Sequence, residues 1–366
     1  MKFLQNPELI KYLDSLLETN ELNLSISDIF SSILGNRDIF DKKEIETLEK
    51  SSHYSNREIV LSKLEDYLDI DTSFEDNEDI LNNYIFNCIY KVDMDKYLTN
   101  PFYLKFKDLV VKENSYELVM DKYLPYELFA YQDMSNFDKR YIEKNSLGYF
   151  QEEYRFLALN DKDVTWMSVT PNEIETMESS LNLVKGNIVV FGLGLGYFAY
   201  MASLKDEVKS ITIVENNPKI ISLFKKHLLP KFERKDKIKI IECDALKCIE
   251  RPLQYDYSFV DLWHNPFDGL ELFVKFKNIE KRNPHCHFLY WLESSFYLLL
   301  RRCMFTLLGE QLEEMKESNY KNVENYLDKV INQYYFQTKS LTISNKAQLD
   351  DLLSDESLIS LLLDER

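Results

Sequence analysis

Three glycines and one glutamate near the middle of the chain have the spacing of a nucleotide-binding unit. Gly192, Gly194 and Gly196 follow directly on an uncharged apolar run, and Glu215 ends a second apolar run. Because glycine lacks a Cβ atom, a turn built from it adopts positive φ angles and lets backbone N–H groups approach a ligand closely. A carboxylate at the tip of the second strand accepts hydrogen bonds from the hydroxyls of a ribose. The order strand, glycine turn, helix, strand, acid therefore predicts a βαβ unit that binds a nucleotide.

The type of nucleotide depends on residue 197. The dinucleotide-binding fingerprint has a glycine at this position, whereas this chain has Tyr197. The sequence Val-Val-Phe-Gly-Leu-Gly-Leu-Gly instead resembles the S-adenosylmethionine (SAM) loop of class I methyltransferases and of aminopropyltransferases. We therefore expect an adenosyl sulfonium or thioether ligand, with NAD as the alternative.

Acidic residues stand at the ends of four predicted strands. Strands are predicted over 188–191, 211–214, 238–243, 255–260 and 285–292, and they alternate with helices. This alternation predicts an α/β fold with a doubly wound, mostly parallel sheet, which binds ligands at the carboxyl ends of its strands. The acids at these ends outline a crevice and are Glu215, Asp244, Asp261 and Glu293. Trp291, at the end of the fifth strand, lines an acceptor pocket or packs in the core.

A hairpin and a capped helix are predicted immediately before the glycine unit. Two β-like runs joined by a polar loop occupy 154–169. Thr170, Pro171 and Glu173 then take the N-cap, N1 and N3 positions of a helix that ends near Leu181. This pattern is typical of a capping box, in which the N3 glutamate bonds back to the N-cap residue.

The remaining chain divides into two predicted helical regions. Apolar spacing predicts a mostly helical N-terminal domain over 1–150, in which the aromatic stripes, including that of 116–137, are core. The nucleotide-binding domain with its hairpin covers 151–310, and a helical extension covers 311–366. A class I methyltransferase sheet normally ends in an antiparallel hairpin, but here only 340–344 suits a strand. The sheet therefore lacks part of its usual edge, or the extension packs as a separate helical cap.

Composition limits the classes of partner. The chain has 366 residues, of which 45% are hydrophobic, and a formal net charge of −18. This length favours two domains, or one domain with a large extension, and the apolar content suffices for a core. Nucleic acid is disfavoured as a partner, because binding a phosphate backbone needs a basic surface. The acidity is that of an ordinary cytoplasmic protein, or it attracts cationic substrates such as polyamines.

Cysteine usage and hydropathy favour the cytoplasm. The five cysteines are an odd number without a CxxC pair, which predicts reduced thiols. The N-terminus lacks the apolar segment of a signal peptide, and charges interrupt the most apolar stretch, 288–308, so we expect no membrane span. His285 and His287 share a strand face but are too few for a zinc site, so no metal is expected. The sequence leaves the oligomeric state open, and a homo-oligomer is one alternative.

The segment 154–293 resembles the spermidine synthase branch of the class I methyltransferase fold. The shared order is hairpin, capped helix, glycine loop, Ile-Val-Glu-Asn-Asn-Pro, Ile-Ile-Glu-Cys-Asp-Ala and Tyr-Asp-Tyr-Ser-Phe-Val-Asp. The resemblance implies that the three glycines wrap the methionine portion of the cofactor and that Glu215 binds the ribose, with Asn216 beside it. It also implies that Asp244, with Ala245 alongside, binds the adenine.

The catalytic signature of aminopropyltransferases is not carried over. Leu195 stands where they have an acid, and Asn265 stands where they have the aspartate that helps to deprotonate the amine. Methyl transfer needs in-line alignment and, for an oxygen or nitrogen acceptor, a nearby base. Asp261 and His264 follow the fourth strand, where an acceptor would enter, and are the predicted catalytic residues. Alternatively, Asp261 binds ligand or caps the next helix, and His264 is a loop residue.

These patterns lead to one expectation and two alternatives. We expect a cytoplasmic, SAM-binding, methyltransferase-like protein whose acceptor is an unidentified small molecule or protein. Its helical N-terminal domain is expected to cover or restrict the acceptor site. A non-catalytic nucleotide-binding scaffold or sensor is the first alternative. An aminopropyltransferase-like enzyme with a divergent catalytic loop is the second.

Overall fold

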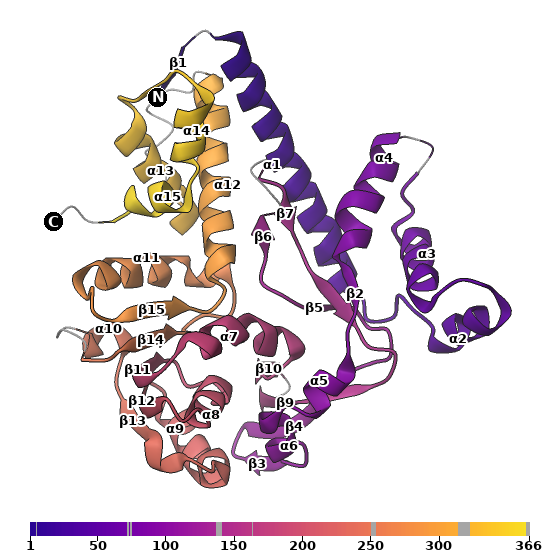
Figure 1. The fold of residues 1–366 in the computed structure, drawn as a ribbon, viewed down its shortest axis with the longest axis vertical. Helices are drawn as coiled ribbons and strands as arrows, with labels where there is room; N and C mark the ends of the chain where they lie inside the picture. Colours follow the sequence, from indigo (N-terminus) through magenta and orange to yellow (C-terminus); the bar gives the residue numbers. More distant parts are fainter. Residues whose placement is uncertain are drawn as a thin grey trace.

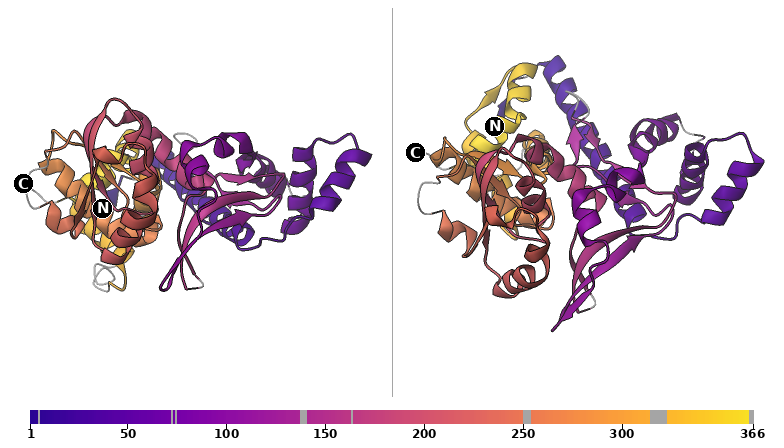
Figure 2. Two further views of the ribbon diagram at one scale, coloured as in Figure 1. Left: turned by 90° about the horizontal axis from the view of Figure 1, so that it is seen from below. Right: turned by 60° about the horizontal axis from the view of Figure 1, so that its bottom comes forward.

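The computed structural model describes residues 1–4, 6–71, 73, 75–136, 141–162, 164–249, 254–313 and 323–363. Figure 1 shows an α/β body at the lower left, the C-terminal helices above it and the N-terminal helices to the right. Figure 2 shows the α/β body and the N-terminal part side by side in two further views. None of the helices in the described part combines the length and the apolar character that a membrane crossing needs.

A five-stranded parallel sheet forms the centre of the α/β body and confirms the predicted fold class. Its strands lie in the order β13-β12-β11-β14-β15, with the first strand in the middle. Their bounds are β11 (Gly186–Phe191), β12 (Val208–Glu215), β13 (Ile238–Glu242), β14 (Tyr257–Val260) and β15 (His287–Tyr290). The chain reverses its direction across the sheet between β11 and β14, and such a switch point opens a crevice at the carboxyl ends of the strands.

Strand register places the predicted site residues next to one another. Phe191, the last residue of β11, lies opposite Val214 of β12 on one side and Val260 of β14 on the other. Gly192, Glu215 and Asp261 therefore leave the same edge of the sheet. The connecting helices are α7 (Pro171–Leu183), α8 (Tyr197–Ser203), α9 (Pro218–Leu223), α10 (Ala245–Cys248), α11 (Pro266–Arg282) and α12 (Glu293–Leu312). Helix α9 continues as a π turn, η3 (Phe224–Leu228), and a 3-10 turn, η4 (Leu229–Lys231); a second 3-10 turn, η5 (Lys235–Lys237), precedes β13.

A second, antiparallel sheet connects the predicted hairpin to the N-terminal part. Its order is β10-β9-β4-β3, with β3 (Val111–Glu113), β4 (Tyr116–Tyr123), β9 (Tyr154–Asp161) and β10 (Val164–Ser168). The hairpin β9–β10 is as predicted, although its loop residue Asp163 lies outside the described residues. Strand β4 pairs with β9 along its whole length. This sheet therefore contains strands from both sides of the domain boundary predicted at residue 150.

The aromatic stretch 116–137 was predicted as helical and as part of the core. The helical part is wrong for the described residues, which end at 136, whereas Tyr116 and Phe129 are buried in the core as predicted. The stretch contains β4, and the short strands that follow are β5 (Phe129–Ala130), β6 (Ser135–Asn136), β7 (Glu143–Lys144) and β8 (Leu147–Tyr149). Strand β8 pairs with β5 and with the earlier β2 (Ile89–Lys91). Aromatic and β-branched side chains pack well on a pleated sheet, so aromatic content alone does not distinguish the two structures.

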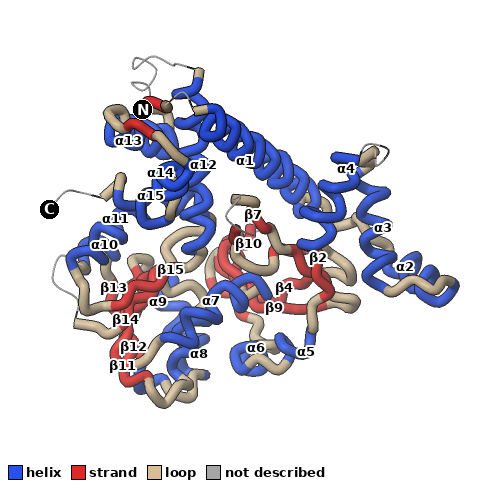
Figure 3. Tube along the Cα trace, turned by 45° about the horizontal axis from the view of Figure 1, so that its top comes forward, coloured by secondary structure: helices blue, strands red, loops and turns tan. Residues whose placement is uncertain are grey.

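The helices of the N-terminal part precede these strands. They are α1 (Pro7–Leu34), α2 (Lys42–Ser51), α3 (Asn56–Leu68), α4 (Glu75–Ile80), α5 (Met94–Leu98) and α6 (Pro101–Phe106), with η1 (Leu81–Ile85) and η2 (Phe86–Cys88) between α4 and β2. Helix α1 joins two hydrophobic cores. Figure 3 shows its course from the C-terminal helices towards α4. Leu9, Leu13 and Leu16 belong to the core of the α/β body, whereas Ile26 and Phe30 belong to the core around α2 and α3.

The C-terminal extension packs against the α/β body and the start of the chain. It contains α13 (Tyr326–Thr338), β16 (Thr342–Ile343), α14 (Lys346–Leu352) and α15 (Asp355–Ser360). Strand β16 falls within the predicted 340–344 but pairs in parallel with β1 (Lys2–Phe3), away from the five-stranded sheet. Among the described residues no antiparallel hairpin follows β15, so the sheet lacks its usual edge.

Candidate functional site

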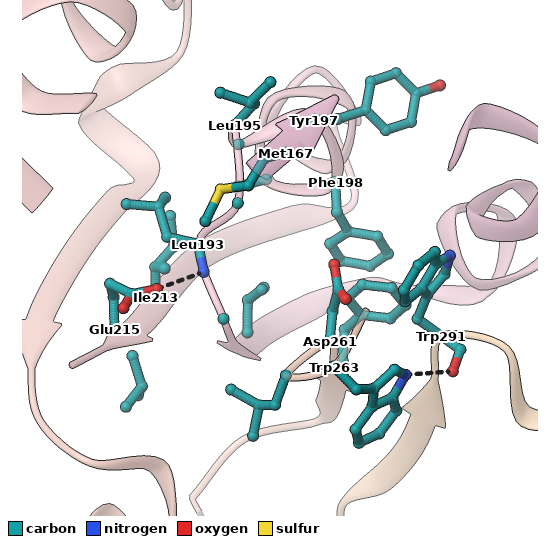
Figure 4. A pocket seen from close by; sticks show the side chains of 18 of the residues that line it. Met167, Leu193, Leu195, Tyr197, Phe198, Ile213, Glu215, Asp261, Trp263 and Trp291 are labelled. Carbon is teal, nitrogen blue, oxygen red and sulfur yellow. Dashed lines mark hydrogen bonds between the residues drawn. The ribbon is translucent and has the colours of Figure 1, made fainter. Parts of the chain in front are cut away.

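A cavity of about 510 Å³ lies at the carboxyl ends of the parallel strands. Its volume falls within the range of small-molecule sites, about 300–1,000 Å³. The structure brings the predicted cofactor-binding and catalytic residues to the wall of this one cavity. These residues are Gly192, Gly194, Gly196, Glu215, Asn216, Asp244, Ala245, Asp261 and His264. Figure 4 shows Glu215 and Asp261 on either side of the turn at Leu193.

The three glycines of the turn have different neighbours. Their φ angles are 97°, 52° and 80° for Gly192, Gly194 and Gly196, a region that side chains disfavour. A Cβ atom on Gly192 would lie 1.9 Å from the Asp261 carbonyl oxygen, and one on Gly196 would lie 2.4 Å from the Phe224 ring. A Cβ atom on Gly194 would have no neighbour within 4 Å. Gly192 and Gly196 therefore permit packing of the protein itself, and Gly194 alone leaves open space for a ligand.

Glu215 ties the glycine turn to the end of β12. Its Oε2 atom accepts a hydrogen bond from the Leu193 N–H at 3.2 Å, and its Oε1 atom accepts one from the Asn217 N–H at 2.8 Å. These bonds fix the carboxylate at the cavity wall. Each carboxylate oxygen has a further lone pair, so the group is able to accept hydrogen bonds from two ribose hydroxyls as well. The Leu193 amide is committed to Glu215, so it is not a free donor for a ligand.

The adenine end of the predicted site lies beyond β13. Asp244 is the N-cap of α10, and its Oδ1 atom accepts a hydrogen bond from the Lys247 N–H at 3.1 Å. Ala245 and Leu246 provide an apolar wall beside it, and Asn216 lines the cavity on the β12 side. An apolar surface edged by one carboxylate suits a base with an exocyclic amino group. The open space at Gly194, the Glu215 carboxylate and this wall together fit an adenosyl ligand.

No protein-family profile matches this sequence, and neither does any curated protein. Several solved structures match parts of this chain. A spermidine synthase from Thermotoga maritima is 13% identical, with a TM-score of 0.29, over 53% of this chain and 61% of that one. A spermidine synthase in complex with the transition state analogue AdoDATO is 15% identical, with a TM-score of 0.31, over 53% and 63%.

A third solved structure also matches part of this chain. The Trypanosoma brucei PRMT1 enzyme-prozyme heterotetramer with AdoHcy is 14% identical, with a TM-score of 0.24, over 32% of this chain and 37% of that one. The matched regions span less than two thirds of each of these chains.

Asp261 lies on the opposite side of the glycine turn from Glu215. Its backbone N–H donates a hydrogen bond to the Phe191 carbonyl at 2.9 Å, so the residue directly follows the last paired residues of β11 and β14. Asp261 lines the cavity. No described residue donates a hydrogen bond to its carboxylate. Burial raises the pKa of Asp261 to about 7. A carboxyl group with such a pKa is able to exchange a proton near neutral pH.

Glu173 is a second acid beside Asp261, and sequence reasoning assigned it another role. Thr170 Oγ1 accepts from the Glu173 N–H at 3.4 Å, as predicted for the N-cap of α7. The reciprocal bond from the Thr170 backbone to the Glu173 carboxylate is not formed, so the predicted capping box is wrong in that half. The carboxylate lines the cavity instead. Burial and the charge of Asp261 raise its pKa well above the ordinary value.

Aromatic side chains form the wall of the cavity around Asp261. The chain has three tryptophans, and all of them, Trp166, Trp263 and Trp291, line the cavity. Trp263 Nε1 donates to the Trp291 carbonyl at 3.2 Å, and Trp291 Nε1 donates to Thr176 Oγ1 at 2.8 Å. Figure 4 shows the first of these bonds beneath Asp261. The hydrogen bonds fix the two indole rings, so this wall is rigid and apolar.

Two residues predicted near the acceptor have other contacts. The His264 side chain is 65% exposed at the rim of the cavity, and its Nδ1 atom lies 3.0 Å from Asp268 in the N-terminal cap of α11. Glu293 does not line the cavity. Its carboxylate accepts from Lys277 Nζ at 2.7 Å at the start of α12, so three and not four of the strand-end acids form the crevice.

The His285–His287 pair lies away from this cavity. Both histidines line a shallow hollow with Lys185 and Gly186, at the amino end of β11 and therefore at the opposite edge of the sheet.

Proposed function

We propose that this protein binds SAM and transfers its methyl group to an acceptor that enters beside Asp261. The observation that carries this proposal is the convergence of the Gly194 opening, the Glu215 carboxylate and Asp261 on one cavity. In the proposed complex Glu215 holds the ribose, and Asp244 with Ala245 holds the adenine. Bound SAM would supply a methyl group on a sulfonium, which is an electrophile.

Asp261 has the properties of a general base for this reaction. Its carboxylate is free of hydrogen bonds from described residues, and its raised pKa of about 7 makes it more basic than an exposed aspartate. Trp263 and Trp291 would exclude water from the acceptor. We prefer Asp261 to His264 as the base, because the exposed His264 ring already lies against Asp268.

Tryptophan fluorescence tests the binding step. Because every tryptophan of the chain lines the cavity, ligand binding must change the emission of at least one of them. We expect saturable changes with SAM and with S-adenosylhomocysteine (SAH), and none with NADH. The variant E215A should lose binding by at least about tenfold, through the loss of a charge-assisted hydrogen bond to the ribose. E242A is its control, since Glu242 lies opposite Glu215 in the register but is exposed outside the cavity.

Turnover separates an enzyme from a binding protein. With a pool of candidate acceptors and radiolabelled SAM, D261N should bind SAM but lose methyl transfer by about 100-fold or more, the usual range for removing a general base. A wild-type protein that binds SAM and labels no acceptor would favour the scaffold or sensor. An aminopropyltransferase is disfavoured by Asn265, whose side chain accepts from the Phe267 and Asp268 N–H groups at 2.9 and 3.2 Å as the cap of α11.

A further inference from the structure

The Glu173 and Asp261 carboxyl groups form an uncompensated acidic pair inside the candidate site. They come from separate elements, the first turn of α7 and the end of β14, and both line the cavity. No described residue donates a hydrogen bond to either carboxylate or forms an ion pair with it. Figure 4 shows the Asp261 carboxylate directed into the cavity, between Phe198 and the indole of Trp291. Two half-buried acids without a partner are costly unless they are neutralised.

Positive charge is scarce around this pair. Among the described residues that line the cavity, His264 alone is able to carry a positive charge, and its ring lies against Asp268. The other titratable groups facing the cavity or the pair are acids, phenols or a thiol: Glu215, Asp244, Tyr123, Tyr197 and Cys243. The protein itself therefore supplies no cation to the pair, and neutralisation must come from protons or from a ligand.

The order of strands places the pair at the sulfonium end of the proposed ligand. The ribose site at Glu215 lies at the tip of β12, and the adenine site at Asp244 lies beyond β13. The sheet continues in the other direction from β12 to β11 and then to β14. The part of the ligand beyond the ribose therefore extends past the glycine turn towards Asp261. Aromatic faces, here those of Phe198, Trp263 and Trp291, are a common surface for sulfonium and ammonium groups.

We propose that Glu173 and Asp261 form a cation subsite that holds a shared proton in the free protein and exchanges it for the positive charge of the ligand. In this step the carboxyl O–H bond breaks, the proton passes to the buffer, and the carboxylate pairs with the cation. The inference rests on the proposed function, because it takes the sulfonium of SAM as the cation. It predicts that the site distinguishes SAM from SAH, which has a neutral thioether in the same position.

Proton release on binding tests the subsite without any need for turnover. Calorimetric titration of the full chain at about pH 6.5, in phosphate and in Tris, gives the number of protons released. SAM should release close to one proton, and SAH should release none, although both carry the same α-amino and carboxyl groups. Between about pH 5 and pH 7 the SAM affinity should rise by up to about tenfold per pH unit, with a flat profile for SAH.

Isosteric variants test whether both acids take part. In D261N, Glu173 remains, so SAM binding should still release a proton. The double variant E173Q/D261N should release no proton, and its preference for SAM over SAH should fall by at least about tenfold. The control is E178Q, a glutamate of the same helix that is 54% exposed and pairs with Lys96. Release abolished by D261N alone would exclude Glu173 and overturn the pair. A thermal unfolding curve of each variant checks that the fold is kept.

Further measurements identify the source of the positive charge and distinguish failure of the cation subsite from failure of the proposed function. Release only when butylammonium is added to the SAH complex would assign the cation to an acceptor amine rather than to the sulfonium. Release in neither arm, with SAM and SAH binding equally well, would overturn the cation subsite while the proposed function stands. Absence of any fluorescence change with SAM or SAH would reject the proposed function and the subsite together.

Discussion

At the scale of single residues, the absence of one Cβ atom has different consequences at each glycine of the turn. The carbonyl of Asp261 occupies the place of a side chain at Gly192, and the Phe224 ring occupies it at Gly196. Only at Gly194 does the missing side chain leave open space. Gly192 thus packs the glycine turn directly against the loop that carries Asp261.

This difference predicts opposite results for two alanine variants. G194A should fold with a loss of about 1–2 kcal/mol from its positive φ angle, and its methyl group should weaken SAM binding by about tenfold or more. G192A should lose at least about 3 kcal/mol of stability, because its Cβ would overlap backbone that cannot move aside alone. Chemical denaturation and fluorescence titration measure the two effects. A G194A protein with unchanged affinity would show that the ligand does not approach this glycine.

The raised pKa of Asp261 predicts how stability depends on pH. A carboxyl group whose pKa is higher in the folded state binds more protons there than in the unfolded chain, so stability falls as pH rises. For Asp261 the fall should extend from the ordinary carboxyl range, about pH 4, to about pH 7. The expected size in the ligand-free protein is on the order of 2–4 kcal/mol. Urea denaturation at several pH values should show a smaller fall for D261N and an unchanged one for E178Q.

At the scale of elements, the acceptor wall depends on a helix that is capped by a distant segment. Helix α12 follows Leu292, which has a φ of 57° and offers no capping side chain. Asp133 takes that role from the N-terminal part, because its Oδ2 atom accepts from the Ser294 N–H at 3.2 Å and it also bonds the Ser295 hydroxyl. Trp291 of the cavity wall directly precedes this turn.

We therefore expect D133A to weaken both the helix and the wall. Loss of the cap should cost about 1–2 kcal/mol, the range for removing an N-cap acid. The emission of Trp291 should change at the same time, since the turn beside it loses an anchor. Thermal unfolding and fluorescence spectra measure these effects, with D38A as the control at an exposed aspartate. An unchanged melting temperature would show that water replaces Asp133 without cost.

At the scale of the whole molecule, one buried ion pair joins three parts of the chain. Arg302 of α12 donates through Nε to Glu143 of β7 at 2.9 Å, and through Nη2 to the Ser27 hydroxyl of α1 at 2.7 Å. The side chains of Arg302 and Glu143 are 15% and 4% exposed. Together with the two cores that α1 connects, this pair fixes the N-terminal part against the α/β body.

Removal of one partner should leave a buried charge without compensation. We expect E143A to lose about 3–5 kcal/mol of stability, because the Arg302 guanidinium stays behind in a poorly solvated place. K275A is the control, since it removes an exposed pair with Glu271 and should cost less than about 1 kcal/mol. Denaturant unfolding measures both. A small effect for E143A would mean that the N-terminal part opens enough to hydrate Arg302.

The sequence by itself determined the parts of this protein whose signals are local. The strand, glycine turn and second strand, and the acids at 215, 244 and 261, are visible because a buried parallel strand is a continuous apolar run and its end is marked by the first polar residue. Parallel strands then bring these ends to one edge of the sheet whatever their separation in the chain.

The tertiary structure alone decided the rest. Glu173 has a sufficient local explanation as an N3 residue, and only the tertiary structure brings it to the same cavity wall as Asp261. The same holds for His264, which lies against Asp268, for Glu293, which pairs with Lys277, and for β4, whose partner β9 is distant in sequence. Side-chain direction and strand pairing depend on contacts between distant segments, and a local pattern compatible with two environments does not select between them.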